Sequence, residues 1–138
     1  SRNLVEIHGD IHDLYCTRCD YAVTVEDYSA LEMPPSCPQC HALVRPRVVL
    51  FGEVLPSHAI EHLYEELDRG FDLVFSIGTT SVFPYIAGPV VQASRAGIPT
   101  VEINPTETNV SRFVDYKLTS GAADSMRAIR ATFLEGTA

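Results

Sequence analysis

The sequence lacks any run of 18 or more apolar residues, and its first residues show no basic segment followed by an apolar core and a cleavage site. Such runs mark membrane-spanning helices and secretory signals, so we expect no membrane partner and a cytoplasmic location. Positive charge is also scarce: ten Lys and Arg stand against eighteen Asp and Glu, for a net charge of -8. Because binding along a nucleic-acid backbone needs a positive surface, we expect no nucleic-acid partner.

Glycine-rich phosphate loops are missing as well, since neither a G-x-G-x-x-G pattern nor a P-loop occurs. A doubly wound nucleotide site normally holds the pyrophosphate on its first glycine loop and the helix that follows. That half of a nucleotide site therefore has no candidate in this chain.

Cysteine is limited to four residues, which form two C-x-x-C pairs separated by seventeen residues. This spacing is typical of zinc sites, and four thiolates complete a tetrahedral shell with no open position for catalysis. Two disulfides would suit a secreted protein, and a redox pair would not need a matching second pair. His41 is left out because the thiolates already fill the shell. We predict one structural zinc ion on Cys16, Cys19, Cys37 and Cys40.

The segment between the cysteine pairs is polar and contains two adjacent prolines. Only Tyr21, Val23 and Val25 alternate as a strand would, which is too little apolar surface for a core. Zinc binding, worth about 10 kcal/mol in small zinc peptides, would then supply the folding energy. We predict a zinc module of residues 14–43, inserted into a larger domain of residues 1–13 and 44–138.

Outside this module, short apolar runs alternate with helical patterns, which is typical of an α/β fold with a mainly parallel sheet. Gly70 and Gly97 are placed to end the first two helices. The helices are expected from Ser57 to Gly70, over about 85–96 and over about 123–134. The predicted strands are 4–7, 48–51, 73–77, 100–103 and 116–118.

Small and polar residues follow each predicted strand, where ligands bind in an open parallel sheet. Glycine lets a ligand approach the backbone closely, and Thr or Asn can hydrogen-bond ribose or phosphate oxygens. One glycine after a strand more often marks only a turn, but their coincidence at one edge indicates a binding site. These segments are His8-Gly9, Gly52-Glu53, Gly78-Thr79-Thr80, Asn104-Pro105 and Gly121-Ala122-Ala123.

Histidine occurs five times, and a histidine near a strand end is often only structural. His58 and His62 are four residues apart on the first predicted helix, but without an HExxH pattern a solvated face is the simpler interpretation. Only His8 combines an apolar strand, a following glycine and the ligand edge. Because an imidazole can accept a proton near neutral pH, His8 is the candidate general base.

Taken together, these motifs resemble those of the sirtuins, NAD-dependent protein lysine deacylases with a Rossmann-like, doubly wound α/β fold. The pieces lie in the family order over most of the chain, and their combination is more specific than any one of them. They are residues 5–9, the two cysteine pairs, residues 45–56, residues 77–81 and Ile103-Asn104.

The resemblance implies roles for individual residues. His8 would accept a proton from a ribose hydroxyl of NAD after the acyl-lysine oxygen has displaced nicotinamide, and the products would be nicotinamide, the free lysine and O-acyl-ADP-ribose. Val49 and Phe51 would line the acyl-lysine tunnel, while the backbones of Gly52 and Glu53 would pair with the substrate peptide as an added strand. The resemblance assigns NAD itself to Gly78, Thr79 and Thr80, its adenosine ribose to Asn104, and its adenine to the neighbourhood of Ala123.

Two departures limit the resemblance. Residues 81–85 differ from the commoner family form, so the loop after Thr80 is expected to shift by one residue. The Gly-Ala-Gly loop and the Gln-Asn-Ile-Asp segment, which precede the catalytic histidine in sirtuins, do not occur. The resemblance therefore implies the C-terminal part of a catalytic domain, a poor catalyst alone, with an exposed sheet edge that favours self-association. The alternatives are a non-catalytic, zinc-stabilised peptide-binding module and mono-ADP-ribosyl transfer.

Overall fold

The computed structural model describes residues 3–136. The chain divides into two compact units, Ser1–Asp68 and Arg69–Ala138, which are described separately below. The boundaries predicted from the cysteine spacing, with residues 14–43 as a module of their own, stay a prediction.

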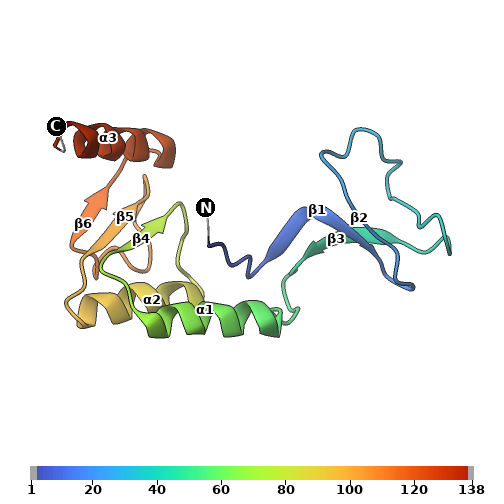
Figure 1. Ribbon diagram of the computed structural model, residues 1–138, viewed down its shortest axis with the longest axis horizontal. Helices are drawn as coiled ribbons and strands as arrows, with labels where there is room; N and C mark the ends of the chain where they lie inside the picture. Colours follow the sequence, from blue (N-terminus) through green and yellow to red (C-terminus); the bar gives the residue numbers. More distant parts are fainter. Residues whose placement is uncertain (1–2, 137–138) are drawn as a thin grey trace. The chain divides into compact units, whose positions relative to one another are not determined.

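The first unit is built on a three-stranded antiparallel sheet (Figure 1). Its order is β2-β1-β3, with β1 at Gly9–Cys16, β2 at Ala22–Thr24 and β3 at Val44–Val48. Helix α1, Ser57–Arg69, follows β3 and ends before Gly70, whose φ of +83° is suited to a helix end. A small core lies beside the sheet and consists of Leu14, Cys16, Cys37 and Val44.

The predicted first strand, residues 4–7, is wrong. These residues are irregular and lead into a turn in which the Gly9 amide donates to the Glu6 carbonyl at 3.0 Å. Strand β1 starts only at Gly9, so His8 precedes a strand, and Gly9 begins it, instead of following one. The apolar pattern misled the prediction because it does not mark a buried face here: Leu4 is 65% exposed.

The predicted second strand, residues 48–51, is also wrong in extent and direction. Strand β3 begins four residues earlier, contains Pro46 and ends at Val48. Proline cannot donate a ladder hydrogen bond, but an edge strand such as β3 tolerates it. Because β1 and β3 pair antiparallel, their ends do not belong to the parallel-sheet edge that the sequence pattern predicted.

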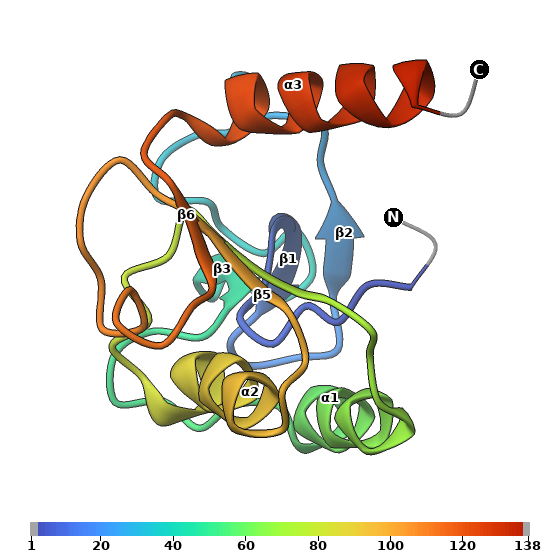
Figure 2. The same ribbon diagram turned by 90° about the vertical axis from the view of Figure 1, so that its left-hand side faces the viewer.

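The second unit contains a parallel sheet of order β4-β5-β6 and confirms the other three predicted strands. Strand β4 spans Val74–Ile77, β5 spans Thr100–Ile103 and β6 spans Tyr116–Leu118. Helix α2, Pro84–Arg95, packs on β4 and β5, and α3, Ala122–Glu135, follows β6. Both views place α2 and α3 on opposite sides of the strands (Figures 1 and 2).

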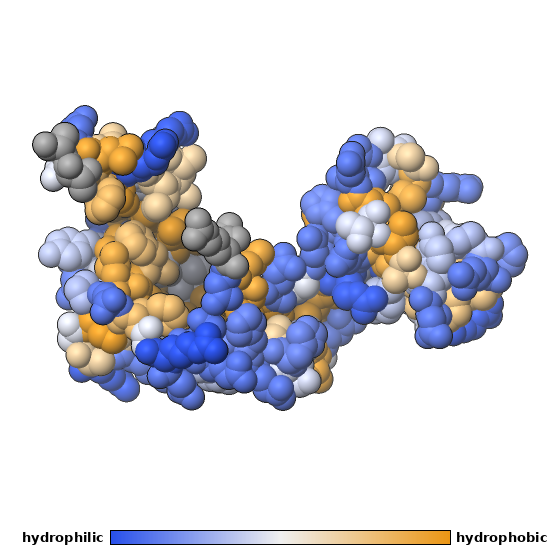
Figure 3. Space-filling view, viewed as in Figure 1, coloured by the Kyte–Doolittle hydropathy of each residue, from blue (hydrophilic) through white to orange (hydrophobic). Residues whose placement is uncertain are grey.

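One face of this parallel sheet is apolar and only partly covered. Register places Phe75, Val101 and Tyr116 in one row and Ile77, Ile103 and Leu118 in the next. Phe75, Ile77 and Tyr116 are 37%, 41% and 64% exposed, and apolar side chains gather over these strands in Figure 3. Within residues 3–136, no helix has the length and apolar character that crossing a membrane requires.

Candidate functional site

The four cysteines gather as predicted, with every pair of sulfur atoms within 4.8 Å. The Sγ atoms of Cys16 and Cys40, and of Cys19 and Cys37, lie 3.5 Å apart. A tetrahedral zinc ion with Zn–S bonds of about 2.3 Å separates its sulfur ligands by about 3.8 Å. Since a disulfide would need about 2.05 Å, all four thiols are free. The cluster therefore fits one structural zinc ion.

Backbone hydrogen bonds shape the two turns that carry the cysteines. The Cys16 amide donates to the Tyr21 carbonyl at 2.8 Å, and the Cys37 amide donates to the Ala42 carbonyl at 2.8 Å. The hydrogen bond from the Ala42 backbone and contacts with the other three cysteines lower the pKa of Cys40 to about 6, whereas desolvation and the same contacts raise the pKa of Cys19 to about 12. The contacts among the thiols thus favour a thiolate, the form that binds metal, at one of the four positions.

The predicted catalytic residue His8 lies in the turn before β1, next to a predicted substrate residue. The Val49 amide donates to the His8 carbonyl at 3.0 Å, directly beyond the pairing of Gly9 with Val48. A Cβ atom on Gly9 would lie 2.0 Å from the Arg47 carbonyl oxygen, and Gly9 has a φ of +75°. Only glycine lets the two backbones approach this closely, and this approach brings His8 beside Val49.

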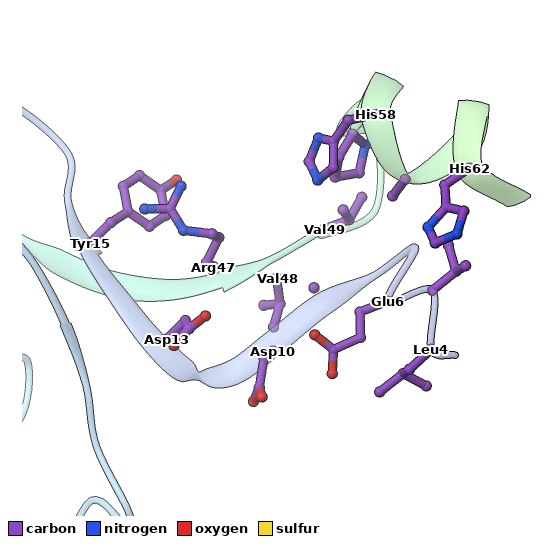
Figure 4. A pocket seen from close by; sticks show the side chains of 14 residues that line it. Leu4, Glu6, Asp10, Asp13, Tyr15, Arg47, Val48, Val49, His58 and His62 are labelled. Carbon is purple, nitrogen blue, oxygen red and sulfur yellow. The ribbon is translucent and has the colours of Figure 1, made fainter. Parts of the chain in front are cut away.

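A cavity of about 550 Å³ opens between the His8 turn, β1, β3 and the start of α1. Val49 lines it, whereas His8, Phe51, Gly52 and Glu53 do not. In Figure 4, His58 and His62 project from α1 on the side where Val49 lies, and Arg47 lies over the ring of Tyr15. The wall is of mixed charge, because it also contains Glu6, Asp10 and Asp13.

The predicted cofactor residues of the second unit gather at the carboxyl ends of β4 and β5. Gly78 has a φ of +65° and donates its amide to the Ile103 carbonyl at 3.0 Å. The Asn104 side chain donates from Nδ2 to the Thr79 carbonyl at 3.0 Å, and the Thr80 carbonyl accepts from the Asn109 amide at 3.3 Å. Gly78, Thr79, Thr80 and Asn104 are thus held together as one group.

Ala123 lies in the first turn of α3, three residues beyond Ser120 in the β6–α3 connection. The Asn104 amide donates to the Leu118 carbonyl at 3.0 Å, so the ends of β5 and β6 are joined. Within residues 3–136, no hydrogen bond links Ala123 itself to Asn104. The assignment of Ala123 to the adenine stays a prediction.

Two polar networks were missed by sequence reasoning. Glu102, on β5, has a fully buried side chain that accepts from Lys117 Nζ at 2.7 Å and from Ser111 Oγ at 2.6 Å. The signal was a single carboxylate in an otherwise apolar strand. The second network pairs Arg45 on β3 with Glu53. The sequence signal for this pair was an arginine next to Pro46, eight residues before an acidic residue.

Comparison with known proteins gives a family model that matches residues 1–84, the model of the Sir2 family. This match covers more than half of the chain. The chain belongs to the Sir2 family.

Relatives and solved structures agree with this assignment. A Sir2 relative from Pseudomonas aeruginosa, named NAD-dependent protein deacylase 2, is 45% identical over 127 residues, which are 91% of this chain and 50% of the relative. The crystal structure of a Sir2 homolog–NAD complex is 33% identical with a TM-score of 0.79, covering 96% of this chain and 53% of that one. A Sir2 structure with the inhibitor EX-527, 2'-O-acetyl-ADP-ribose and a deacetylated p53 peptide is 29% identical with a TM-score of 0.78, covering 93% and 55%.

The Sir2 likeness confirms the predicted fold class, part of a Rossmann-like α/β sheet with a small four-cysteine module. This chain spans about half the length of the relatives that it matches. The Sir2 match also includes the His8–Gly9 turn, both cysteine pairs and the segment through Pro84.

Proposed function

We propose that the protein acts as an NAD-dependent protein lysine deacylase, with acyl-lysine and NAD converted to lysine, nicotinamide and O-acyl-ADP-ribose. The observation that carries the proposal is the Sir2 match over residues 1–84, the range that contains the His8 turn held against Val49. The names of the relatives and the NAD and acetyl-ADP-ribose complexes support it. The cytoplasm is the location that the sequence predicts.

The residue roles follow from the predicted motif and the local geometry. His8 is the general base that accepts the ribose proton, since its position is held through its own backbone and by Gly9. Val49 and Phe51 contact the acyl-lysine chain, and Gly52 with Glu53 presents backbone to an extended peptide. In the second unit, Gly78, Thr79, Thr80 and Asn104 bind NAD, and Ala123 contacts its adenine.

Zinc has a structural part in this proposal. Four thiolates leave the ion no open position, so it supplies no Lewis acid to the substrate. Its contribution is to hold the ends of β1 and β3, where Cys16 pairs with Val44. The other ends of these strands carry the His8 turn and the segment that follows Val48.

The direct test uses the full-length gene product with an acetylated peptide and NAD. We expect nicotinamide release with formation of O-acetyl-ADP-ribose, measured by mass spectrometry, and a loss of about a hundredfold or more in His8→Ala. His12→Ala is the matched control, because His12 lies four residues away on β1 and its ring forms an ion pair with the half-exposed Asp10 at 2.9 Å. Unchanged turnover in His8→Ala would contradict the assignment.

A non-catalytic, zinc-stabilised peptide-binding module is the second candidate, favoured by the four-cysteine cluster, which fits a structural ion in the unit that also contains the predicted peptide-binding residues. Such a module would bind an acetylated peptide with the same affinity with and without NAD, which calorimetry can measure. ADP-ribose attached to the acceptor protein, seen by mass spectrometry, would instead indicate mono-ADP-ribosyl transfer.

A further inference from the structure

The segment after β3 forms a tight turn whose polar groups are closed by one carboxylate. The Glu53 amide donates to the Leu50 carbonyl at 3.0 Å, and the Leu50 amide donates to Glu53 Oε2 at 2.9 Å. Gly52 has a φ of +87° at the third position of this turn, where a positive φ favours glycine. Glu53 thus fixes the turn with both its backbone and its side chain.

Arg45 holds the same carboxylate from the edge strand β3. Its Nη1 donates to Glu53 Oε1 at 2.7 Å and its Nη2 to Glu53 Oε2 at 3.1 Å, a bidentate pair. The Nη2 atom also donates to the Val48 carbonyl at 3.0 Å. The guanidinium lies 5.8 Å from the ring centroid of Tyr15, the residue before the zinc ligand Cys16. We call the paired side chains the Arg45–Glu53 clamp.

The clamp occupies the polar groups on either side of the turn but not those at its tip. The Val48 carbonyl, the Leu50 amide and the Glu53 amide are engaged, whereas Phe51 and Gly52 have no hydrogen-bond partner within residues 3–136. The Phe51 side chain is 97% exposed. A fixed turn with an unpaired tip is the arrangement that an incoming extended strand requires.

We propose that Arg45 and Glu53 are positioning residues, which hold the turn of residues 50–53 in the conformation in which the Gly52 backbone and the Glu53 carbonyl pair with an extended acyl-lysine peptide. The inference rests on the proposed function, because it names how the substrate side of that site is ordered. An ion pair this exposed to solvent contributes little to global stability. Its effect is therefore local, and it reduces the ordering that the turn must undergo when peptide binds.

The clamp keeps its charge over the whole working range of pH. Hydrogen bonds from Arg45 and from the Leu50 amide lower the pKa of Glu53 from 4.5 to about 2. Since the folded pKa is depressed, the ordering is fully present above pH 4.5 and is lost only as the pH falls toward 2. A clamp effect on peptide binding should thus be the same at every pH between about 5 and 9.

The test compares Arg45→Met and Glu53→Gln in the full-length gene product with zinc bound. We expect the KM for an acetylated peptide to rise about tenfold in each variant, with the KM for NAD and the zinc content within about twofold of wild type. The double variant should be no worse than either single one, because both remove the same pair. Arg112→Met is the control: this guanidinium lies over Phe113 at 4.7 Å and forms no ion pair with an acid within residues 3–136.

Hydrogen exchange supplies a readout that does not depend on activity. Without peptide or NAD, amides in a fragment covering 48–55 should exchange about tenfold faster in both variants, while α1 exchanges as in wild type. Unchanged exchange in this fragment, or faster exchange with an unchanged peptide KM, would overturn the inference. If wild type deacylates no peptide, the proposed function fails, and the affinity of a labelled acetyl-lysine peptide for wild type and both variants decides the inference instead.

Discussion

At Gly9, two independent constraints act on one residue. The φ of +75° disfavours any side chain, and a Cβ would lie 2.0 Å from the Arg47 carbonyl oxygen. Gly9→Ala should therefore destabilise the first unit by about 3 kcal/mol or more, as chemical denaturation of the zinc-loaded protein would measure. The backbone pairing that holds His8 beside Val49 should be lost with it.

At Gly70 only the backbone constraint applies, because its φ is +83° but a Cβ atom added there would meet nothing within 4 Å. Gly70→Ala should cost about 1 kcal/mol, the cost of a left-handed backbone alone. If Gly9→Ala and Gly70→Ala lowered the stability equally, the close contact of the added Cβ with the Arg47 carbonyl would have relaxed without cost.

Lys117 neutralises a carboxylate that has no contact with solvent. Burial raises the pKa of Glu102, but the hydrogen bonds from Lys117, Ser111 and Thr108 outweigh it and hold the pKa below 4.5. Lys117→Met leaves the charge unpaired and should cost about 3–5 kcal/mol at neutral pH, measured by thermal unfolding. Glu102→Gln combined with Lys117→Met should cost less, because no buried charge then remains.

The pH dependence of this pair has a definite sign. Because the folded pKa of Glu102 is depressed, its contribution to stability is present above pH 4.5 and declines as the pH falls through the folded value. The difference in stability between wild type and Lys117→Met should therefore become smaller in acid. If that difference in stability became larger in acid, Glu102 would not be the titrating group responsible for it.

Among the elements, the cysteine-bearing segment has a core that is built in part from the zinc ligands themselves. Its buried core comprises Leu14 and Val44 together with two of the four cysteines, Cys16 and Cys37. Chelation of zinc should therefore unfold residues 14–43, seen as fast hydrogen exchange, while α2 with β4 and β5 stays protected. Zinc addition should restore protection, with one zinc per chain by elemental analysis. Full protection after chelation would refute the structural role.

Local patterns predicted the elements that depend on local information. Helices α1, α2 and α3 and strands β4, β5 and β6 lie within a residue or two of expectation, because their apolar periodicity and their end signals agree. The cysteine spacing likewise predicted the cluster, because each C-x-x-C pair is a local pattern. The segments around His8 and Phe51 could not be placed, because their positions depend on contacts distant in sequence, which are the approach of Gly9 to Arg47 and the hydrogen bond from the Val49 amide to the His8 carbonyl.

For the whole chain, the apolar face of the β4-β5-β6 sheet predicts self-association. Phe75, Ile77 and Tyr116 are exposed on one face of the sheet, with Tyr116 64% exposed, and exposed apolar surface favours association in water. The 138-residue chain should show a mass that rises with concentration in light scattering after gel filtration. The double variant Tyr116→Lys with Ile77→Lys should have a mass closer to that of the monomer. If its mass equalled that of wild type, this face would not be the surface of association.

Lys117 is the single lysine in the 138-residue sequence. Its ammonium group is occupied by Glu102, Thr106 and Ser111. Reagents that modify primary amines, including activated esters and reactive acyl thioesters, thus meet no freely exposed lysine anywhere in the described chain. A protein proposed to remove acyl groups from lysine is in this way protected over this region from acquiring them, and arginine carries nearly all of its positive charge.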